Sequence, residues 1–541
     1  MKDISLIQSN IEKESNIMTN DLLWKADLGN GYYKNPIIFA DYSDPDVIRV
    51  EDTYYMTASS FNYTPGLPIL ISKDLVNWEL KNYALKNIPY ERYNNPAHAK
   101  GVWAPAIRYH EGRFWICFGM PDEGIFMVHT DHPLGEWSDP ILLLEGKGLI
   151  DPCPIWDDDG KAYVVHGYAK SRIGFNSILG IFPISWDGTK AIGEDKFIFD
   201  GTSRQKTIEG PKIYKKNGWY YIFAPAGGVR TGWQTVLRSK NIYGPYEEKI
   251  VLVQGNTPIN GPHQGGLVDT PNKEEWFIHF QDRGLYGRIT HLQPVVWKDG
   301  WPYIGINQDD HGCGEPVITY KKPDGVRSKE PTYLQASDDF ETSDLALQWQ
   351  WLGNHRKDFY SLTERPGYLR LFSLNPSGDE KVTIWNSSNV LTQKIVCPQF
   401  QADVKMDIKG LSFHETAGLV IMGGQYAYLG IKKEESGTSL IYVESEGTDH
   451  WRNEKILLEI PVPLSVNVIT LRLKLQEEEG KMLVRMSYCL EDGIFKDTGY
   501  VFAPSDHTWV GAKLGLFSLA LDSNENHGYA DFESIKVDAL F

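Results

Sequence analysis

Carboxylates open several repeated segments of this chain. Asp44 opens Asp44-Pro45-Asp46-Val47-Ile48, Asp151 opens Asp151-Pro152-Cys153-Pro154-Ile155, and Glu209 opens Glu209-Gly210-Pro211-Lys212-Ile213. Any one of these acids could serve only to cap a turn, but three at matching places favour a shared site. Two facing carboxylates suit the cleavage of a glycosidic bond, because one protonates the leaving oxygen while the other activates water or attacks the anomeric carbon. A third can keep the acid protonated through like-charge repulsion.

The segments that follow these acids share one pattern. An apolar strand runs into a Gly or Asp turn and then into an aromatic, β-rich strand, as a hairpin does. A further copy opens at Trp103 and a looser one at His263, so that five units follow one another roughly 45 to 60 residues apart. Repetition at this period, with four strands per unit, predicts a five-bladed β-propeller and not a helical solenoid.

The propeller geometry predicts where the acids meet. The innermost strand of each blade lines the central channel, so residues at the start of each unit converge on one end of the axis. Those places hold Asp44, Trp103, Asp151, Glu209 and His263. Three carboxylates from three blades are therefore expected in one funnel. We also expect the first strand of the chain to complete the last blade.

The repeat ends near Lys322, where Pro, Gly and charged residues replace the alternating pattern. Beyond it, short strands with regular alternation predict an antiparallel β-sandwich, so the whole chain is expected to be all-β. The predicted divisions are a polar N-terminal lead-in (1–33), the propeller catalytic domain (34–322), a linker (323–332) and the sandwich (333–541). Asp339-Phe340-Glu341 and Asp531-Phe532-Glu533 suggest that the two ends of the sandwich pair as neighbouring strands.

Bulk composition limits the partners and the compartment. The chain has 541 residues, with 54 Lys and Arg against 71 Asp and Glu, and a net charge of −17, which disfavours a nucleic-acid partner. Five cysteines without CxxC spacing indicate a reducing compartment. Neither a signal peptide nor a run of 18 apolar residues is visible, so we expect a cytoplasmic protein that does not enter the membrane.

Four other residues are candidates for binding. Arg288 could bond sugar hydroxyls or steer a carboxylate, although a plain surface role fits its spacing equally well. Phe61 and Trp103 could form the apolar wall of a sugar subsite, although core packing is the default for aromatic residues in a β-protein. His263 is expected on the channel axis, where it could pack, bridge water or face a hard cation.

Taken together, five motifs resemble those of glycoside hydrolase family 43, in the same order and at similar separations. They are Ser43-Asp44-Pro45-Asp46, Trp103-Ala104-Pro105, Ile150-Asp151-Pro152, Ile208-Glu209-Gly210-Pro211 and Gly287-Arg288-Ile289-Thr290. From Ala336-Ser337-Asp338-Asp339-Phe340 onward the chain is similar to the concanavalin-like, jelly-roll sandwich that follows the propeller in the β-xylosidase branch of that family. The resemblance covers nearly the whole chain after residue 33.

The resemblance implies a five-bladed propeller that hydrolyses glycosides with inversion. It makes Asp44 the general base, Glu209 the general acid, and Asp151 the carboxylate that tunes and orients Glu209. The remaining matched positions line the subsite of the terminal sugar or the channel: Phe61, Trp103, Arg288 and His263. No cofactor is required, but in some members the channel His binds calcium through water, so His263 is the candidate for such a metal contact. Gln264 departs from the pattern, because many members have a smaller residue there, and this leaves the metal open.

The function implied is an exo-acting β-xylosidase that releases xylose from the non-reducing end of β-1,4-xylo-oligosaccharides. α-L-Arabinofuranosidase activity, alone or alongside, is the close alternative, because the two terminal pentoses present similar hydroxyl patterns. Two other hypotheses stay open: a non-catalytic carbohydrate-binding propeller and a retaining fructosidase. The expected partner is a xylo-oligosaccharide or arabinoxylo-oligosaccharide, and a homo-oligomer stays open because this branch commonly forms dimers or tetramers.

Overall fold

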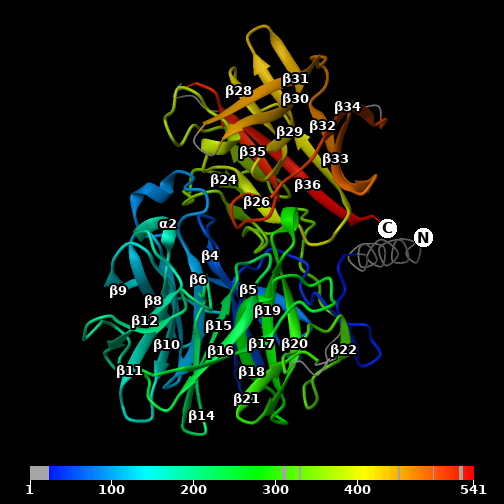
Figure 1. Ribbon diagram of the computed structural model, residues 1–541. Helices are drawn as coiled ribbons and strands as arrows, with labels where there is room; N and C mark the ends of the chain where they lie inside the picture. The colour runs from blue at the N-terminus through cyan, green and yellow to red at the C-terminus, as the bar shows by residue number, and fades with distance from the viewer. Residues whose placement is uncertain are drawn as a thin grey trace, which may run out of the picture.

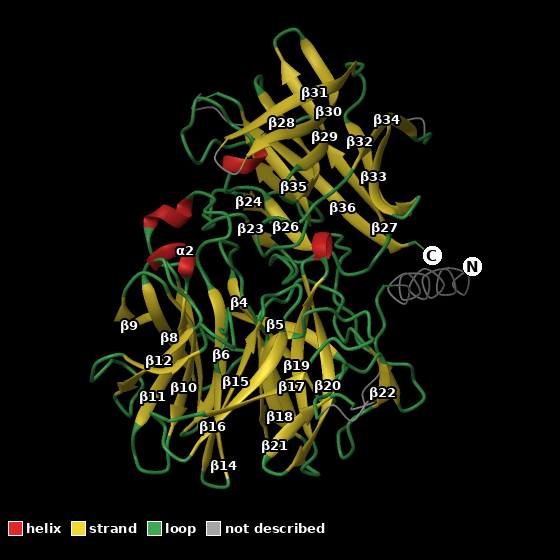
Figure 2. Cartoon of the chain, in the orientation of Figure 1, coloured by secondary structure: helices red, strands yellow, loops and turns green. Residues whose placement is uncertain are grey.

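The computed structural model describes residues 23–306, 312–327, 331–448, 451–490, 493–522 and 528–540. Residues 1–22 of the predicted lead-in and 328–330 of the predicted linker lie outside these ranges. Strands make up nearly all of the regular structure (Figure 2), which confirms the all-β prediction. The described helices are short: α2 (Lys170–Ile173) and the 3-10 turns η1 (Glu91–Asn94), η2 (Gly284–Tyr286) and η3 (Ile384–Asn386). None of them is long and apolar enough to cross a membrane.

Five four-stranded antiparallel sheets form the blades of the propeller, as the repeats predict. Blade 1 contains β2 (Asp46–Val50), β3 (Thr53–Thr57), β4 (Gly66–Ser72) and β5 (Trp78–Leu85); blade 2 contains β6 (Trp103–His110), β7 (Arg113–Met120), β8 (Gly124–Thr130) and β9 (Ile141–Glu145). Blade 3 contains β10 (Leu149–Trp156), β11 (Ala162–Tyr168), β12 (Ile178–Ile184) and β13 (Lys196–Asp200). Blade 4 contains β14 (Lys212–Lys216), β15 (Trp219–Ala226), β16 (Trp233–Ser239) and β17 (Glu247–Leu252); blade 5 contains β18 (His263–Asp269), β19 (Glu275–Asp282), β20 (Arg288–Lys298) and β21 (Trp301–Ile304).

The ring closes differently from the prediction that the first strand completes the last blade. Blade 5 has four strands of its own, but β21 pairs only with residues 295–298 of β20, and Ile38 forms an antiparallel bridge with Thr290 in the earlier part of that strand. The first described strand, β1 (Tyr32–Lys34), instead pairs with β22 (Thr319–Lys321), which follows blade 5. Tyr33 is fully buried, and its hydroxyl donates to the carbonyl oxygen of Leu292 in β20 at 2.8 Å. The N-terminal segment thus completes blade 5 only in part: β1 lies outside the sheet, while Ile38 pairs with the edge of β20.

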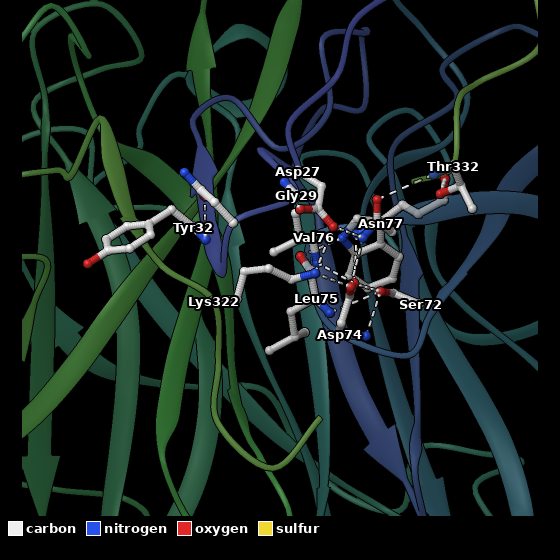
Figure 3. A network of polar contacts seen from close by, with 12 residues as sticks. Asp27, Gly29, Tyr32, Ser72, Asp74, Leu75, Val76, Asn77, Lys322 and Thr332 are labelled. Carbon is white, nitrogen blue, oxygen red and sulfur yellow. Dashed lines mark hydrogen bonds and ion pairs between the residues drawn. The ribbon is translucent and has the colours of Figure 1, made fainter. Parts of the chain in front are cut away.

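A buried charge cluster holds the two ends of the propeller segment to blade 1 (Figure 3). The Lys322 ammonium lies 2.7 Å from Asp27 Oδ2 and 3.0 Å from Asp74 Oδ2. Both carboxylates are almost inaccessible to solvent, and Asn77 donates to each of them. An unpaired buried carboxylate costs folding free energy, so the Lys322 ammonium is needed to stabilise Asp27 and Asp74 in the folded chain.

Two seven-stranded antiparallel sheets form the C-terminal sandwich. In sheet order, the first contains β23 (Gln350–Trp351), β26 (Leu391–Lys394), β35 (Lys513–Ala520), β28 (Glu415–Met422), β29 (Tyr426–Glu434), β30 (Gly437–Thr448) and β31 (Trp451–Pro461). The second contains β24 (Tyr360–Ser361), β25 (Leu369–Phe372), β36 (Tyr529–Ala539), β27 (Phe400–Asp407), β32 (Val468–Glu478), β33 (Lys481–Cys489) and β34 (Lys496–Phe502). A bridge between Asp338 and Ile535 confirms that the two ends of this domain lie side by side.

The sandwich, coloured yellow to red in Figure 1, lies over one end of the blue-to-green propeller. Its β23 docks on the loop between β3 and β4, where Thr64 and Trp351 exchange backbone hydrogen bonds of 2.6 and 3.1 Å. A second contact lies at the turn between β19 and β20, where the Ala512 N–H donates to the Leu285 carbonyl oxygen at 2.7 Å. These two loops adjoin the predicted site residues Phe61 and Arg288, so the sandwich borders the candidate site.

Candidate active site

The start of each innermost strand has one residue in the left-handed region of backbone conformation. These residues are Asp44 (φ 55°), Ala104 (φ 34°), Asp151 (φ 56°), Gly210 (φ 59°) and Gln264 (φ 33°). The prediction that Trp103, Glu209 and His263 share the place of Asp44 and Asp151 is therefore wrong by one residue. Glu209 corresponds to Ser43 and Ile150, one position before the left-handed residue. Backbone strain of this kind gathers at functional sites.

The one-residue offset gives the three carboxylates different surroundings. Asp44 and Asp151 are each 5% exposed, whereas the Glu209 side chain retains 30% of its accessible surface. The more open Glu209 can reach a ligand, while the other two are almost inaccessible to solvent.

Three donors hold the carboxylate of Asp44. The hydroxyls of Ser43 and Ser59 donate to Oδ2 at 2.7 and 2.6 Å, and Arg288 Nη1 donates to Oδ1 at 3.1 Å. The same Arg288 nitrogen donates to Ser43 Oγ at 2.8 Å, and the guanidinium lies over the ring of Phe280. These contacts fix the orientation of the Asp44 carboxylate. Arg288 is therefore a buried partner of Asp44 and not a surface residue.

Asp151 and Glu209 form an interacting pair of acids. The Gly210 N–H donates to Asp151 Oδ2 at 2.7 Å, which fixes the carboxyl beside the segment that holds Glu209. Burial raises the pKa of Asp151 to about 8, and the charges of Glu209 and Asp44 add to the effect. A neighbouring like charge and a low-dielectric site both disfavour a second negative charge. The site therefore disfavours the ionised form of Asp151.

His263 contacts Glu209. Its Nε2 lies 3.0 Å from Glu209 Oε1, and the imidazole is fully buried. The second ring nitrogen, Nδ1, is buried and has no hydrogen-bond partner among the residues that the structure describes. His263 therefore orients Glu209 at the channel, and the tautomer with a proton on Nε2 donates to the carboxyl oxygen.

The residues around His263 do not fit a directly bound metal. Among the described residues, no group of three His, Cys, Asp or Glu side chains gathers as a metal site does. The nitrogen that faces the acids is already engaged by Glu209, and hard cations need several oxygen ligands. Calcium bound through water at His263 stays a prediction, and no chemical step is derived through it.

Aromatic side chains from both domains form an apolar wall. Phe61 (φ 52°) is 4% exposed and pairs through its backbone with Val102, the residue before Trp103. The ring of Trp103 meets Trp509 of the sandwich edge to face, with centroids 4.6 Å apart. Phe61, Trp103 and Trp509 belong to one cluster that crosses the domain boundary. Flat apolar faces of this kind are suited to sugar rings.

Several residues at this site escape prediction from sequence. Ser59 and Trp509 lie in segments with no repeat signal, and only the folded chain brings them to Asp44 and Trp103. Arg172 of α2 also lies over the ring of Trp103, at 5.1 Å. Ser43 could have been found, because it stands at a fixed place directly before the motif acid. For the other three, no signal in a single sequence exists.

Comparison with known proteins identifies the family. The model for glycosyl hydrolases family 43 matches residues 33–302, and the model for the β-xylosidase C-terminal concanavalin A-like domain matches residues 337–538. A protein of Xylanibacter ruminicola is 38% identical over 92% of this chain and 88% of its own length. This chain belongs to glycoside hydrolase family 43. Family membership confirms that it is an enzyme of the glycoside hydrolase class and confirms the predicted resemblance.

Other relatives of this family 43 chain have more specific names. A β-xylosidase of Formosa agariphila is 36% identical over 95% of this chain and 91% of its own. A non-reducing end α-L-arabinofuranosidase of Bacteroides ovatus is 35% identical over 64% of this chain and 67% of its own. The solved structure of a xylan β-1,4-xylosidase from Bacillus halodurans superimposes with a TM-score of 0.81 at 26% identity, covering 93% of this chain and 99% of that one.

Proposed function

We propose that this family 43 enzyme is an inverting, exo-acting β-xylosidase that removes xylose from the non-reducing end of β-1,4-xylo-oligosaccharides. The observation that supports this most is the inequality of the three acids. Asp44 is held by two hydroxyls and a guanidinium, whereas Glu209 is open to a ligand and its charge helps to raise the pKa of the neighbouring Asp151. One ionised base and one protonated acid are what an inverting glycosidase needs.

In this proposal the proton that Asp44 removes from water goes to Oδ1. Each carboxylate oxygen has two lone pairs, and Oδ2 already accepts two hydroxyl hydrogen bonds. Oδ1 accepts one bond, from Arg288, and so retains a place for water. As the water oxygen bonds to the anomeric carbon, the glycosidic oxygen leaves and takes a proton from Glu209. His263 engages Oε1 of Glu209, so we assign this proton to Oε2.

The other residues of the site have supporting roles in this proposal. Phe61, Trp103 and Trp509 form the apolar wall against the terminal sugar, and Arg288 fixes Asp44. Asp151 keeps the shared proton on the acid pair until the leaving oxygen takes it. The sandwich contributes to the substrate site through Trp509 and is not required for the proton transfers.

The test compares 4-nitrophenyl β-xyloside and 4-nitrophenyl α-arabinofuranoside with wild-type enzyme, Glu209→Ala and Asp44→Ala. We expect xyloside turnover in the wild type and, on xylo-oligosaccharides assayed alongside, a loss of roughly a thousandfold in both variants, within the range that positioned acids and bases contribute. Glu136→Ala, a solvent-exposed acid of the propeller, is the matched control and should leave turnover unchanged. Proton NMR of the first-formed xylose anomer decides the stereochemistry, and retention would contradict the inverting assignment.

α-L-Arabinofuranosidase activity is the second candidate, because the Bacteroides ovatus relative has that name and a xylosidase/arabinosidase of Humicola insolens is 28% identical over 87% of this chain. The same assay separates the two. Turnover of the arabinofuranoside alone would replace the first proposal, and turnover of both would make the enzyme bifunctional. Binding of xylo-oligosaccharide without turnover of either substrate would favour a non-catalytic propeller.

A further inference from the structure

Asp41 is a buried carboxylate that receives hydrogen bonds from both domains. It is 6% exposed, and the Arg288 N–H donates to its Oδ1 at 2.9 Å. The N–H of Gly511, in the sandwich, donates to its Oδ2 at 3.0 Å. One side chain thus joins the strand that holds Arg288 to the segment of the sandwich that follows Trp509.

The backbones of Gly511 and Gly287 lie so close together that neither position has room for a side chain. A Cβ atom on Gly511 would lie 2.4 Å from the nitrogen of Gly287, and one on Gly287 would lie 2.4 Å from Asp41 Cγ. Gly287 also has a left-handed φ of 71°, which favours glycine. Next along the chain, the Ala512 N–H donates to the Leu285 carbonyl oxygen at 2.7 Å. Residues 511 and 512 therefore fit against the turn at 285–288 in a single position.

Residues 41–44 contact Arg288 along its whole length, from its backbone to its guanidinium group. Asp41 accepts the Arg288 N–H, and the Tyr42 N–H donates to the Arg288 carbonyl oxygen at 3.1 Å. Ser43 and Asp44 then accept hydrogen bonds from Arg288 Nη1. Four consecutive residues thus fix one arginine, and the first of them also fixes the sandwich.

Two lysines of the sandwich, the buried Lys513 and the half-buried Lys394, lie near Asp41. Lys513 Nζ lies 3.9 Å from Asp41 Oδ2, and its side chain is 2% exposed. Lys394 lies directly opposite Lys513 on the neighbouring strand, and its ammonium donates to Gln350 Oε1 at 2.8 Å. The rings of Tyr63 and Tyr42 lie beneath Lys513 and Lys394 at 4.4 and 5.1 Å. Burial lowers the pKa of both lysines, with the Lys513 charge adding to the effect at Lys394, and the negative charge of Asp41 opposes the shift at each of them.

We propose that Asp41 is a positioning residue that couples the seating of the sandwich, and with it the Trp509 wall, to the Arg288–Asp44 pair. Its carboxylate is the shared acceptor for Arg288 and Gly511, so a shift of either segment moves the other. Asp41 does not touch the substrate itself. Its catalytic consequence rests on the proposed function, whereas its structural consequence does not.

The test uses the full-length chain with Asp41→Asn. An amide keeps the size of the side chain but has one acceptor oxygen, so one of the two N–H groups is left facing an NH₂ group. We expect kcat/KM on 4-nitrophenyl β-xyloside to fall roughly ten- to hundredfold, the range expected for a hydrogen bond to a charged group. Amide hydrogen exchange should accelerate in peptides that cover both 285–290 and 509–513. Unchanged exchange in either segment would overturn the coupling, whatever substrate the enzyme takes.

Lys513→Met separates positioning from charge balance. This variant keeps both hydrogen bonds to Asp41, so kcat/KM should stay within about twofold of wild type, while the thermal midpoint falls because Asp41 loses a buried cation. Combined with Asp41→Asn, it removes both charges and should recover the thermal midpoint but not kcat/KM. Recovery of kcat/KM together with the midpoint would show that Asp41 acts only through charge balance. If Asp41→Asn does not fold, a large loss of kcat/KM in Lys513→Met alone would likewise overturn the proposal.

Wild-type turnover in the same assay tests the proposed function independently. A wild type that hydrolyses no xyloside refutes that function and leaves the hydrogen-exchange prediction to decide the coupling.

Discussion

Replacement of Asp151 by Asn should move the alkaline limb of the pH–rate profile to lower pH. Burial and the charges of Glu209 and Asp44 raise the pKa of Asp151 from 3.8 to about 8, so the Asp151–Glu209 pair retains its last proton until about pH 8. Wild-type activity should therefore decline above that pH, as the pair loses the proton that the leaving oxygen needs. With Asn, one proton site and one like charge disappear, and the remaining acid ionises earlier.

The size of the shift follows from the causes of the perturbation. The change of about four units corresponds to roughly 5–6 kcal/mol of preference for the protonated form. Burial of Asp151 is the largest cause and is removed together with its carboxyl group, while the Glu209 charge is the second cause. We assign roughly one to two units to the repulsion between the two acids. The alkaline limb should therefore move down by about one to two pH units.

The assay is initial-rate hydrolysis of 4-nitrophenyl β-xyloside from pH 4 to 10, with the released nitrophenol read after quenching in base. The Asn carbonyl oxygen can still accept the Gly210 N–H, so the backbone at the site is retained. Asp338→Asn is a matched control, because Asp338 is another acid whose pKa is raised by burial but which lies in the sandwich near Trp349. An alkaline limb that stays in place while kcat falls would refute the shared-proton reasoning and leave Asp151 an orienting residue only.

The remaining predictions concern stability and the sandwich wall. Lys322→Met should lower the free energy of unfolding by about 3–5 kcal/mol in urea titrations, because it strands two buried carboxylates, whereas exposed Lys321→Met should change it little. Burial raises the pKa of Asp27, but hydrogen bonds from Lys322 and Asn77 lower it on balance, so Asp27 stabilises the fold above pH 3.8 and this stabilisation is lost as the pH falls below that value. The Lys322→Met protein should therefore lose less stability in acid than the wild type. An equal loss would argue against the pairing of Asp27 with Lys322. Trp509→Ala should raise KM for the nitrophenyl xyloside roughly fivefold, the equivalent of about 1 kcal/mol, with kcat changed less; an unaltered KM would remove the sandwich from the substrate site.

The repeat pattern alone determined the blades. Each blade is formed by consecutive strands, so hairpin spacing, turn residues and aromatic alternation within roughly fifty residues are sufficient to predict it. The same local signal located Asp44, Asp151 and Glu209, because each stands at a fixed distance from a Pro or Gly turn. The sandwich was also predictable as a second antiparallel domain from regular alternation.

The relations between blades and between domains were decided by the tertiary structure. The residue with the left-handed conformation is Gly210 and not Glu209. Because the repeats vary in length, their sequences do not show an offset of one residue. Ser59, Trp509 and Asp41 acquire their roles through partners in other loops: Gly511 lies 470 residues from Asp41, and Arg288 lies 247 residues from it. Sequence patterns report local conformation, whereas such pairings depend on the packing of the whole chain, which brings one carboxylate within reach of two distant backbones.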